Sequence, residues 1–123
     1  MKLIIIGFGG FIGAVLRYEL SGWTYRLMGS RLPYGTLAVN VIGSFILGFF
    51  LVLAEGRFAI SPQIRNFVAV GILGAFTTFS TFSFETMALL QQNLFKQALL
   101  NILLNVILAL TAVWMGMVSA KLV

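Results

Sequence analysis

The chain has 123 residues, of which 60% are hydrophobic and 9% are charged, and its mean hydropathy is +1.05. A soluble domain has about 25% charged residues, so this composition predicts a single-domain integral membrane protein and excludes a soluble one. The lack of cysteine and histidine excludes disulfides, zinc sites of the usual kind and histidine catalysis. The net charge of +5 does not indicate nucleic-acid binding, because the basic residues are scattered singly between apolar runs.

Four apolar windows follow one another along the chain, and they predict an all-α protein with four transmembrane helices in one domain, residues 1–123. The expected spans are approximately 3–22, 32–54, 62–90 and 96–121. The first is long enough only if its helix continues past Arg17, a cation near the expected helix end whose long side chain can reach the interface. Gly9 and Gly13 are four residues apart, which favours close helix–helix packing.

The third span is the unusual one, because its second half is rich in hydroxyl groups. Five serines and threonines fall within residues 77–83, and Gly71 and Gly74 precede them. Threonine and glycine are weak helix formers, so the sequence predicts a helix that is broken near the middle of the membrane. A polar, interrupted segment at that depth is tolerated only where it faces protein or water. The third span therefore predicts a polar route through the membrane.

Three asparagines lie inside apolar windows, Asn40 in the second and Asn101 and Asn105 in the fourth. The latter two are separated by four residues and so share one helix face. Their amide N–H groups either join helices by hydrogen bonds or form a track for a small polar solute. Their occurrence beside a hydroxyl-rich, broken helix favours the track.

Phe79 and Phe82 also share a helix face, and their electropositive ring edges could line an anion path, although packing is the commoner role of such a pair. The carboxylates Glu19, Glu55 and Glu85 all fall near expected interfaces or span ends, and no acid pair or nucleophile–base pair is visible, so an enzyme is not expected. A small dual-topology multidrug or cation exporter is the main alternative, but it would be expected to carry an acid deep in a span. A membrane assembly protein whose polar residues only join helices is a third possibility.

The positive charges are balanced between the two sides of the expected four-span topology. One side carries Lys2, Arg57, Arg65 and Lys121, and the other carries Arg17, Arg26, Arg31 and Lys96. Loop charge then sets no preferred orientation, which predicts insertion both ways up and an antiparallel homodimer that could enclose a path. The alternative is that Arg17 lies inside a helix and the balance is accidental.

Three stretches of the sequence resemble the Fluc (CrcB) family of fluoride channels, and the resemblance covers almost the whole chain. They are GGFIGAVLRY at 9–18, GTLAVN at 35–40 and GAFTTFSTFS at 74–83. The resemblance implies a multi-pass protein of the cell (inner or plasma) membrane that forms a dual-topology antiparallel homodimer with two pores. It also implies passive export of fluoride from the cytoplasm, which relieves fluoride toxicity.

The resemblance assigns roles to particular residues. Asn40 corresponds to the pore asparagine of the family, and Phe79 and Phe82 to its pore phenylalanines. Asn101 and Asn105 stand where the family often has a track of serine or threonine. The backbone carbonyls of Gly74 and Thr77 would hold a structural sodium ion (Na+) at the dimer axis.

Fluoride itself gives a physical reason to expect donors along such a path. It is small and strongly hydrated, so a pore must replace its water with hydrogen-bond donors. Ser80 and Thr81 can donate in addition to the three asparagines. No lysine or arginine is placed in the middle of a span, where it would trap the ion, and conduction needs weak binding at several sites.

Overall fold

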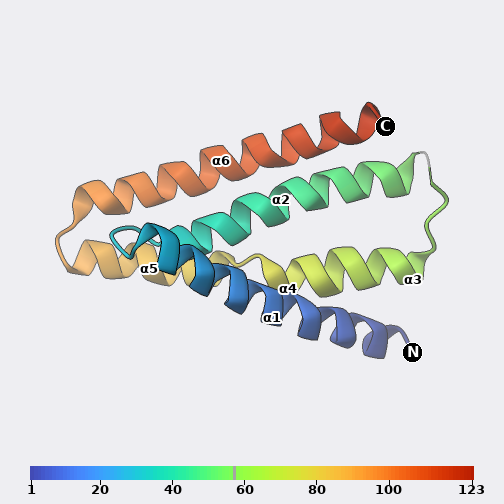
Figure 1. The fold of residues 1–123 in the computed structure, drawn as a ribbon, viewed down its shortest axis with the longest axis horizontal. Coiled ribbons are helices and arrows are strands. Elements are labelled where there is room, and N and C mark those ends of the chain that lie inside the picture. The colour runs from blue at the N-terminus through green and yellow to red at the C-terminus, as the bar shows by residue number, and fades with distance from the viewer. Residues whose placement is uncertain (57) are drawn as a thin grey trace.

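The computed structural model describes residues 1–56 and 58–123, and these residues form helices joined by short connections (Figure 1). In chain order the elements are α1 (Lys2–Met28), α2 (Tyr34–Glu55), α3 (Pro62–Arg65), the π-helical segment η1 (Asn66–Leu73), α4 (Gly74–Phe76), α5 (Phe79–Gln91) and α6 (Phe95–Lys121). Four stretches are long and apolar enough to cross a membrane, namely Lys2–Met28, Tyr34–Glu55, Pro62–Gln91 and Phe95–Lys121. The predicted all-α class with four membrane-spanning helices is confirmed.

Both termini lie at one end of the molecule, together with the end of α2 and the start of α3 (Figure 1). The connection from α1 to α2 and the turn from α5 to α6 lie at the opposite end. This arrangement agrees with the four-span topology for which the positive charges on each side of the membrane were counted from the sequence. Arg57, which the sequence places with the termini, lies outside the described residues.

The first helix is longer than expected and corrects the placement of Arg17. α1 continues through Arg17 and Gly22 to Met28 and ends at Gly29, which has φ 82° and donates its N–H to the Tyr25 carbonyl at 2.9 Å. A single glycine inside a helix costs only about 1 kcal/mol, so Gly22 does not end it, whereas the left-handed conformation at Gly29 does. Arg17 therefore lies inside the helix and is not a helix-end cation.

Glycines allow the helices to approach closely along two seams. A Cβ atom added at Gly9 would lie 2.9 Å from the Cα of Gly71, and one added at Gly13 would collide with the Ile72 carbonyl. These contacts join α1 to η1 and confirm the packing expected of Gly9 and Gly13. On the other seam, Gly116 of α6 meets the Phe45 carbonyl of α2 in the same way.

The third span is interrupted at Thr77 and Thr78, which confirms the predicted break. Both residues are extended, with φ −84° and ψ 156° at Thr77 and φ −151° and ψ 120° at Thr78. The following hydroxyl-rich residues return to a helix because Thr78 caps it, its hydroxyl accepting the Thr81 N–H at 3.2 Å. Ser83 donates its hydroxyl to the Phe79 carbonyl at 3.0 Å within that helix. Two residues, not the whole hydroxyl-rich stretch, therefore form the break.

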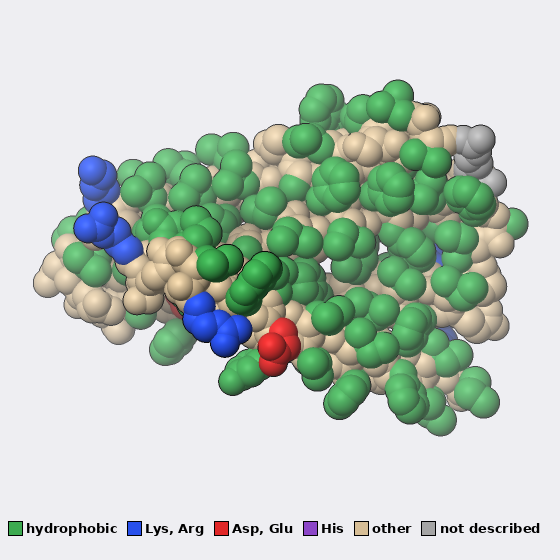
Figure 2. Space-filling view, in the orientation of Figure 1, with side chains coloured by type: hydrophobic (Ala, Val, Ile, Leu, Met, Phe, Trp, Pro, Cys, Tyr) green, Lys and Arg blue, Asp and Glu red, His purple; other side chains and the backbone are tan. Residues whose placement is uncertain are grey.

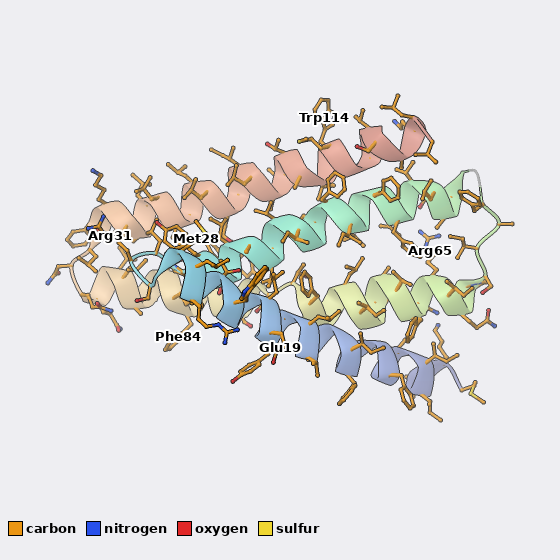
Figure 3. All side chains as sticks on the ribbon, in the orientation of Figure 1. Glu19, Met28, Arg31, Arg65, Phe84 and Trp114 are labelled. Carbon is orange, nitrogen blue, oxygen red and sulfur yellow. The ribbon has the colours of Figure 1, made fainter. Side chains whose placement is uncertain are left out.

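The outer surface is apolar over most of its length, with basic side chains gathered at one end and a few charged side chains nearer the middle of this face (Figure 2). Leu3, Phe11 and Trp114 are 82%, 70% and 63% exposed, respectively. Figure 3 shows Trp114 projecting outward from α6. Side chains of this kind stand in lipid or against another protein, as in a multi-pass membrane protein.

Candidate functional site: a neutral amide cavity at the helix break

Asn40 of α2 satisfies the backbone at the break. Its Oδ1 accepts the Thr78 N–H at 2.9 Å, and its Nδ2 donates to the Thr78 carbonyl at 3.1 Å. The Asn40 side chain thus bonds to both backbone polar groups of Thr78, which lack helical partners because Thr78 is extended. In a continuous α-helix, the Thr78 N–H would instead bond to the Gly74 carbonyl. Asn40 therefore holds the third span open.

The three asparagines form one connected line of hydrogen bonds. Asn40 Nδ2 also donates to Asn105 Oδ1 at 3.1 Å. Asn105 Nδ2 in turn donates to the carbonyl oxygen and Oδ1 of Asn101, at 2.9 Å and 3.1 Å. Asn101 Nδ2 donates to the Thr86 hydroxyl at 2.8 Å, which donates to the Phe82 carbonyl. This line connects α2, α6 and α5, and Thr86 is a member that the sequence did not identify.

A cavity of about 370 Å3 lies beside Asn40, between the break and α6, and we call it the amide cavity. It is lined by Asn40, Ser44, Leu47, Thr77, Thr78, Phe79, Phe82, Asn105, Val106, Ala109 and Leu110. The rings of Phe79 and Phe82 lie 5.4 Å apart and are tilted by 57°. Phe79 is 79% exposed, whereas Phe82 is 8% exposed. Among the described residues, no charged side chain lines this cavity.

A second cavity, of about 640 Å3, reaches the break from the side of α1, and we call it the charged cavity. Its lining is Ala14, Arg17, Tyr18, Glu19, Ser21, Gly22, Tyr25, Arg26, Thr36, Val39, Thr78 and Thr81. Thr78 lines both cavities, Thr81 lines only this one, and Ser80 lines neither. The Thr78 hydroxyl lies 3.3 Å from that of Ser80 and donates to that of Thr81 at 3.1 Å. Ser80 and Thr81 are thus grouped at the break but are separate from the asparagine line.

Glu85 has a more interior position than its place in the sequence indicated. It lies within α5 and is half-buried. Its carboxylate accepts a hydrogen bond from the Tyr25 hydroxyl at 3.0 Å and another from the Thr36 hydroxyl. These donors come from α1 and α2, so the sequence around Glu85 does not indicate them. The carboxylate is held by two hydroxyl groups, and it is not among the residues lining the amide cavity.

The carbonyls of Gly74 and Thr77 have the character required of neutral oxygen ligands. In the part of the chain that the structure describes, no hydrogen bond reaches either oxygen. Gly74 is exposed, and the Thr77 hydroxyl donates back to the Leu73 carbonyl at 3.0 Å. Two unpaired backbone oxygens at an exposed helix break fit a hard monovalent cation such as sodium. A cluster of three or more acidic, histidine or cysteine ligands does not occur among the described residues.

The amino-acid sequence is similar to that of proteins in one family. Residues 4–117 match the family described as CrcB-like protein, Camphor Resistance (CrcB). A protein of Shewanella frigidimarina named fluoride-specific ion channel FluC is 50% identical over 116 residues, covering 94% of this chain and 92% of that protein. Another with this name, from Sulfurovum sp., is 47% identical over 97% of this chain and 93% of its own length.

A third protein of the same name, from Methylococcus capsulatus, is longer. It is 47% identical over 121 residues, which are 98% of this chain but only 53% of that protein. The aligned region thus takes in the helix break, the three asparagines and both phenylalanines of the amide cavity. On the match to residues 4–117 and these identities, the chain belongs to the CrcB-like family.

Proposed function

We propose that this protein is a fluoride-selective channel through which fluoride leaves the cytoplasm passively, and that it is not an enzyme. The observation that carries the proposal is the amide cavity, an uncharged space beside a helix break that is lined by amide, hydroxyl and phenyl groups. Relatives up to 50% identical over most of the chain are named fluoride-specific ion channels. No proton-transfer group other than hydroxyls lines the cavity among the described residues, so it offers little to catalysis.

Passage of an anion through this cavity requires exchange of hydrogen bonds. Both N–H groups of the Asn40 amide and both of the Asn105 amide already have protein acceptors. Fluoride must therefore replace an acceptor such as Asn105 Oδ1 to bind to Asn40. This competition weakens binding, and weak binding at several sites is what conduction needs. The ring edges of Phe79 and Phe82 add electropositive walls that carry no full charge.

The active form that we propose is an antiparallel homodimer with two pores. The charged cavity reaches the helix break at Thr78, and Gly74, four residues earlier in the chain, is exposed. Hydrocarbon does not tolerate exposed charged groups or irregular backbone, so protein or water must cover them. If Arg17 is left out because it lies well inside α1, the cations near the ends of the spans number three on one side (Arg26, Arg31, Lys96) and, from the sequence, four on the other, which still gives little orientational bias.

A structural sodium ion at the axis of such a dimer belongs to the same proposal. Two copies would contribute the carbonyls of Gly74 and Thr77, four neutral oxygens in all, and the ion would supply charge that holds the two breaks together. Asn40 would support this role from within each chain. Its Oδ1 accepts the Thr78 N–H, so the Gly74 carbonyl oxygen has no donor within its own helix.

Efflux from liposomes tests the channel proposal. Purified protein is reconstituted into vesicles loaded with fluoride or with chloride, and release is followed with ion-selective electrodes. Fast, passive release of fluoride without release of chloride is expected. Movement of organic cations coupled to a proton gradient, without fluoride release, would favour the exporter alternative, for which Glu85 is the available carboxylate. Release of neither fluoride nor organic cations would favour the third alternative, a membrane assembly protein.

The orientation proposal is tested separately by labelling. Single cysteines at the two termini are reacted with a membrane-impermeant reagent in intact cells. About half the copies should react at each terminus if insertion is dual. Reaction of all copies, or of none, would contradict dual insertion while leaving fluoride conduction open.

A further inference from the structure

A third cavity lies at the end of the molecule where the connection from α1 to α2 meets the start of α6. Its volume is about 340 Å3, and it is lined by Arg31, Leu32, Tyr34, Lys96, Gln97 and Leu100. None of these residues lines the amide or the charged cavity. Figure 3 shows Arg31 at this end, and Figure 2 shows basic side chains gathered there. The cavity therefore needs an explanation separate from ion conduction.

Two tight turns bring the cations together. After α1 ends, the Tyr34 N–H donates to the Leu32 carbonyl at 2.7 Å, which folds the short segment that carries Arg31. After α5 ends, Asn93 adopts a left-handed conformation with φ 61°, and the Leu94 N–H returns to the Leu89 carbonyl at 2.9 Å. Lys96 consequently stands in the first turn of α6. Residues far apart in the sequence thus present two positive charges to one space.

The charges in this cavity have no counter-charge of their own. Among the residues that the structure describes, no carboxylate lines the cavity, and neither Arg31 nor Lys96 forms an ion pair. The first turn of α6 has no acidic residue, and its N-cap residue Leu94 provides no side-chain cap. The unpaired N–H groups of that turn add to the positive potential. The cavity is therefore suited to an anion.

The rest of the lining indicates what kind of anion. Leu32 and Leu100 form an apolar wall, and the aromatic ring and hydroxyl of Tyr34 combine both characters, as is typical at a membrane interface. The volume of about 340 Å3 is within the range of small-molecule sites and far exceeds what a halide ion fills. A ligand with an anionic head and an apolar continuation matches this lining better than a free inorganic anion does.

We propose that this cavity binds the phosphate group of an anionic phospholipid. Arg31 and Lys96 contact the phosphate oxygens, Tyr34 and Gln97 donate hydrogen bonds to the headgroup, and Leu32 and Leu100 contact the start of the acyl chains. Basic pockets between helices at the membrane surface are suited to such headgroups. The site holds a lipid at a fixed place on the protein and takes no part in selecting fluoride.

The test is lipid selectivity measured by native mass spectrometry. Protein in detergent is mixed with equal amounts of phosphatidylglycerol and phosphatidylcholine, and the ratio of the bound lipids is recorded. The double variant Arg31→Gln/Lys96→Gln should lose preference for phosphatidylglycerol by about fivefold for each cation removed. The control Lys2→Gln/Lys121→Gln removes the same charge from the opposite end and should keep the wild-type preference.

Two further measurements separate the proposal from its competitors. Inorganic phosphate, added at the concentration of the lipid, should not displace phosphatidylglycerol, and displacement would show a site for free phosphate and overturn the proposal. Fluoride efflux from vesicles of neutral lipid should be the same in both double variants. Equal loss of lipid preference in both variants, or slower efflux without a change in lipid preference, would also overturn it.

Discussion

The amide cavity and the charged cavity meet at Thr78, yet their linings differ in charge. The first is lined by Asn40, Asn105 and phenyl rings, and no charged side chain of the described residues reaches it. The second is lined by Arg17, Glu19 and Arg26. The difference shows that one helix break can serve two purposes. Its neutral side can bind an anion weakly, whereas its charged side must be covered by water or protein.

The largest effect is expected from placing a charge in the neutral cavity with Asn40→Asp. The carboxylate still accepts the Thr78 N–H but cannot donate to the Thr78 carbonyl or to Asn105 Oδ1, and it repels both oxygens and an approaching anion. The lost bonds lower the stability of the chain. Repulsion between the carboxylate and fluoride raises the barrier to passage by about 3 kcal/mol, so fluoride efflux should fall by on the order of 100-fold.

The matched control is Asn66→Asp, the same chemical change in η1 at a residue that lines neither cavity. It should leave efflux unchanged, and the secondary structure of both variants is compared by circular dichroism. Wild-type efflux in Asn40→Asp would show that Asn40 only joins helices.

The next effect concerns the exposed side of the break. A Cβ at Gly74 has no neighbour in its own chain closer than the Ala69 carbonyl at 3.6 Å, so Gly74→Leu should be tolerated within one chain. If a second copy covers this face, overpacking costs about 2 kcal/mol and dimer association weakens by on the order of 30-fold. Association is measured by fluorescence energy transfer between labelled copies in vesicles.

Gly43→Ala is the contrasting variant. Its added methyl group would collide with the Thr77 side chain and approach Phe76 Cδ1 at 3.0 Å, both in the same chain. Thermal stability of the chain should therefore fall in Gly43→Ala and not in Gly74→Leu. An undisturbed dimer in Gly74→Leu would argue against an interface at the break.

A smaller effect is expected where the neutral cavity loses an aromatic ring. Phe82→Ile and Phe79→Ile both remove an electropositive ring edge, worth about 1.4 kcal/mol, and each should slow fluoride efflux by about tenfold. Only Phe82 is buried, at 8% exposure against 79% for Phe79, so only its variant should also lose thermal stability. Slower efflux in Phe82→Ile alone would indicate packing, not a direct role of the rings.

The smallest effect is expected on the charged side. Tyr25→Phe removes the 3.0 Å hydrogen bond to Glu85, while the bond from the Thr36 hydroxyl remains. The free energy of unfolding should fall by about 1 kcal/mol. Tyr18→Phe is the control, because Tyr18 is 78% exposed and its hydroxyl forms no hydrogen bond within the described residues. Equal stability of the two variants would show that Glu85 does not depend on Tyr25.

The sequence predicted the features of this fold that depend on local composition. Apolar windows located the four spans, and clustered hydroxyls located the break in the third. It did not predict the π-helical segment η1, whose residues are ordinary helix-compatible apolar residues and whose widened winding accompanies the close contact of Gly71 with Gly9. Nor did it place the end of α1, which the left-handed turn at Gly29 decides.

Prediction of the site was limited for a related reason. The spacing of Asn101 and Asn105 placed them on one face, but whether they bond to each other or remain open to a solute depends on their neighbours in three dimensions. The structure shows both bonded to protein, with Thr86 completing the line. Glu85 likewise depends on Tyr25 and Thr36, two residues from other helices. Such pairings carry no signal in the local sequence.

The bonds between Asn40 and Thr78 have a consequence for biosynthesis. Both polar groups of the Thr78 backbone are satisfied by a side chain of α2, at 2.9 Å and 3.1 Å. In lipid without α2, each would cost several kcal/mol unpaired, so the third span alone favours an unbroken helix. α2 precedes the third span in the chain and is inserted first. The break therefore forms only when the third span docks against α2, so it is a product of helix packing and not a property of the inserted span alone.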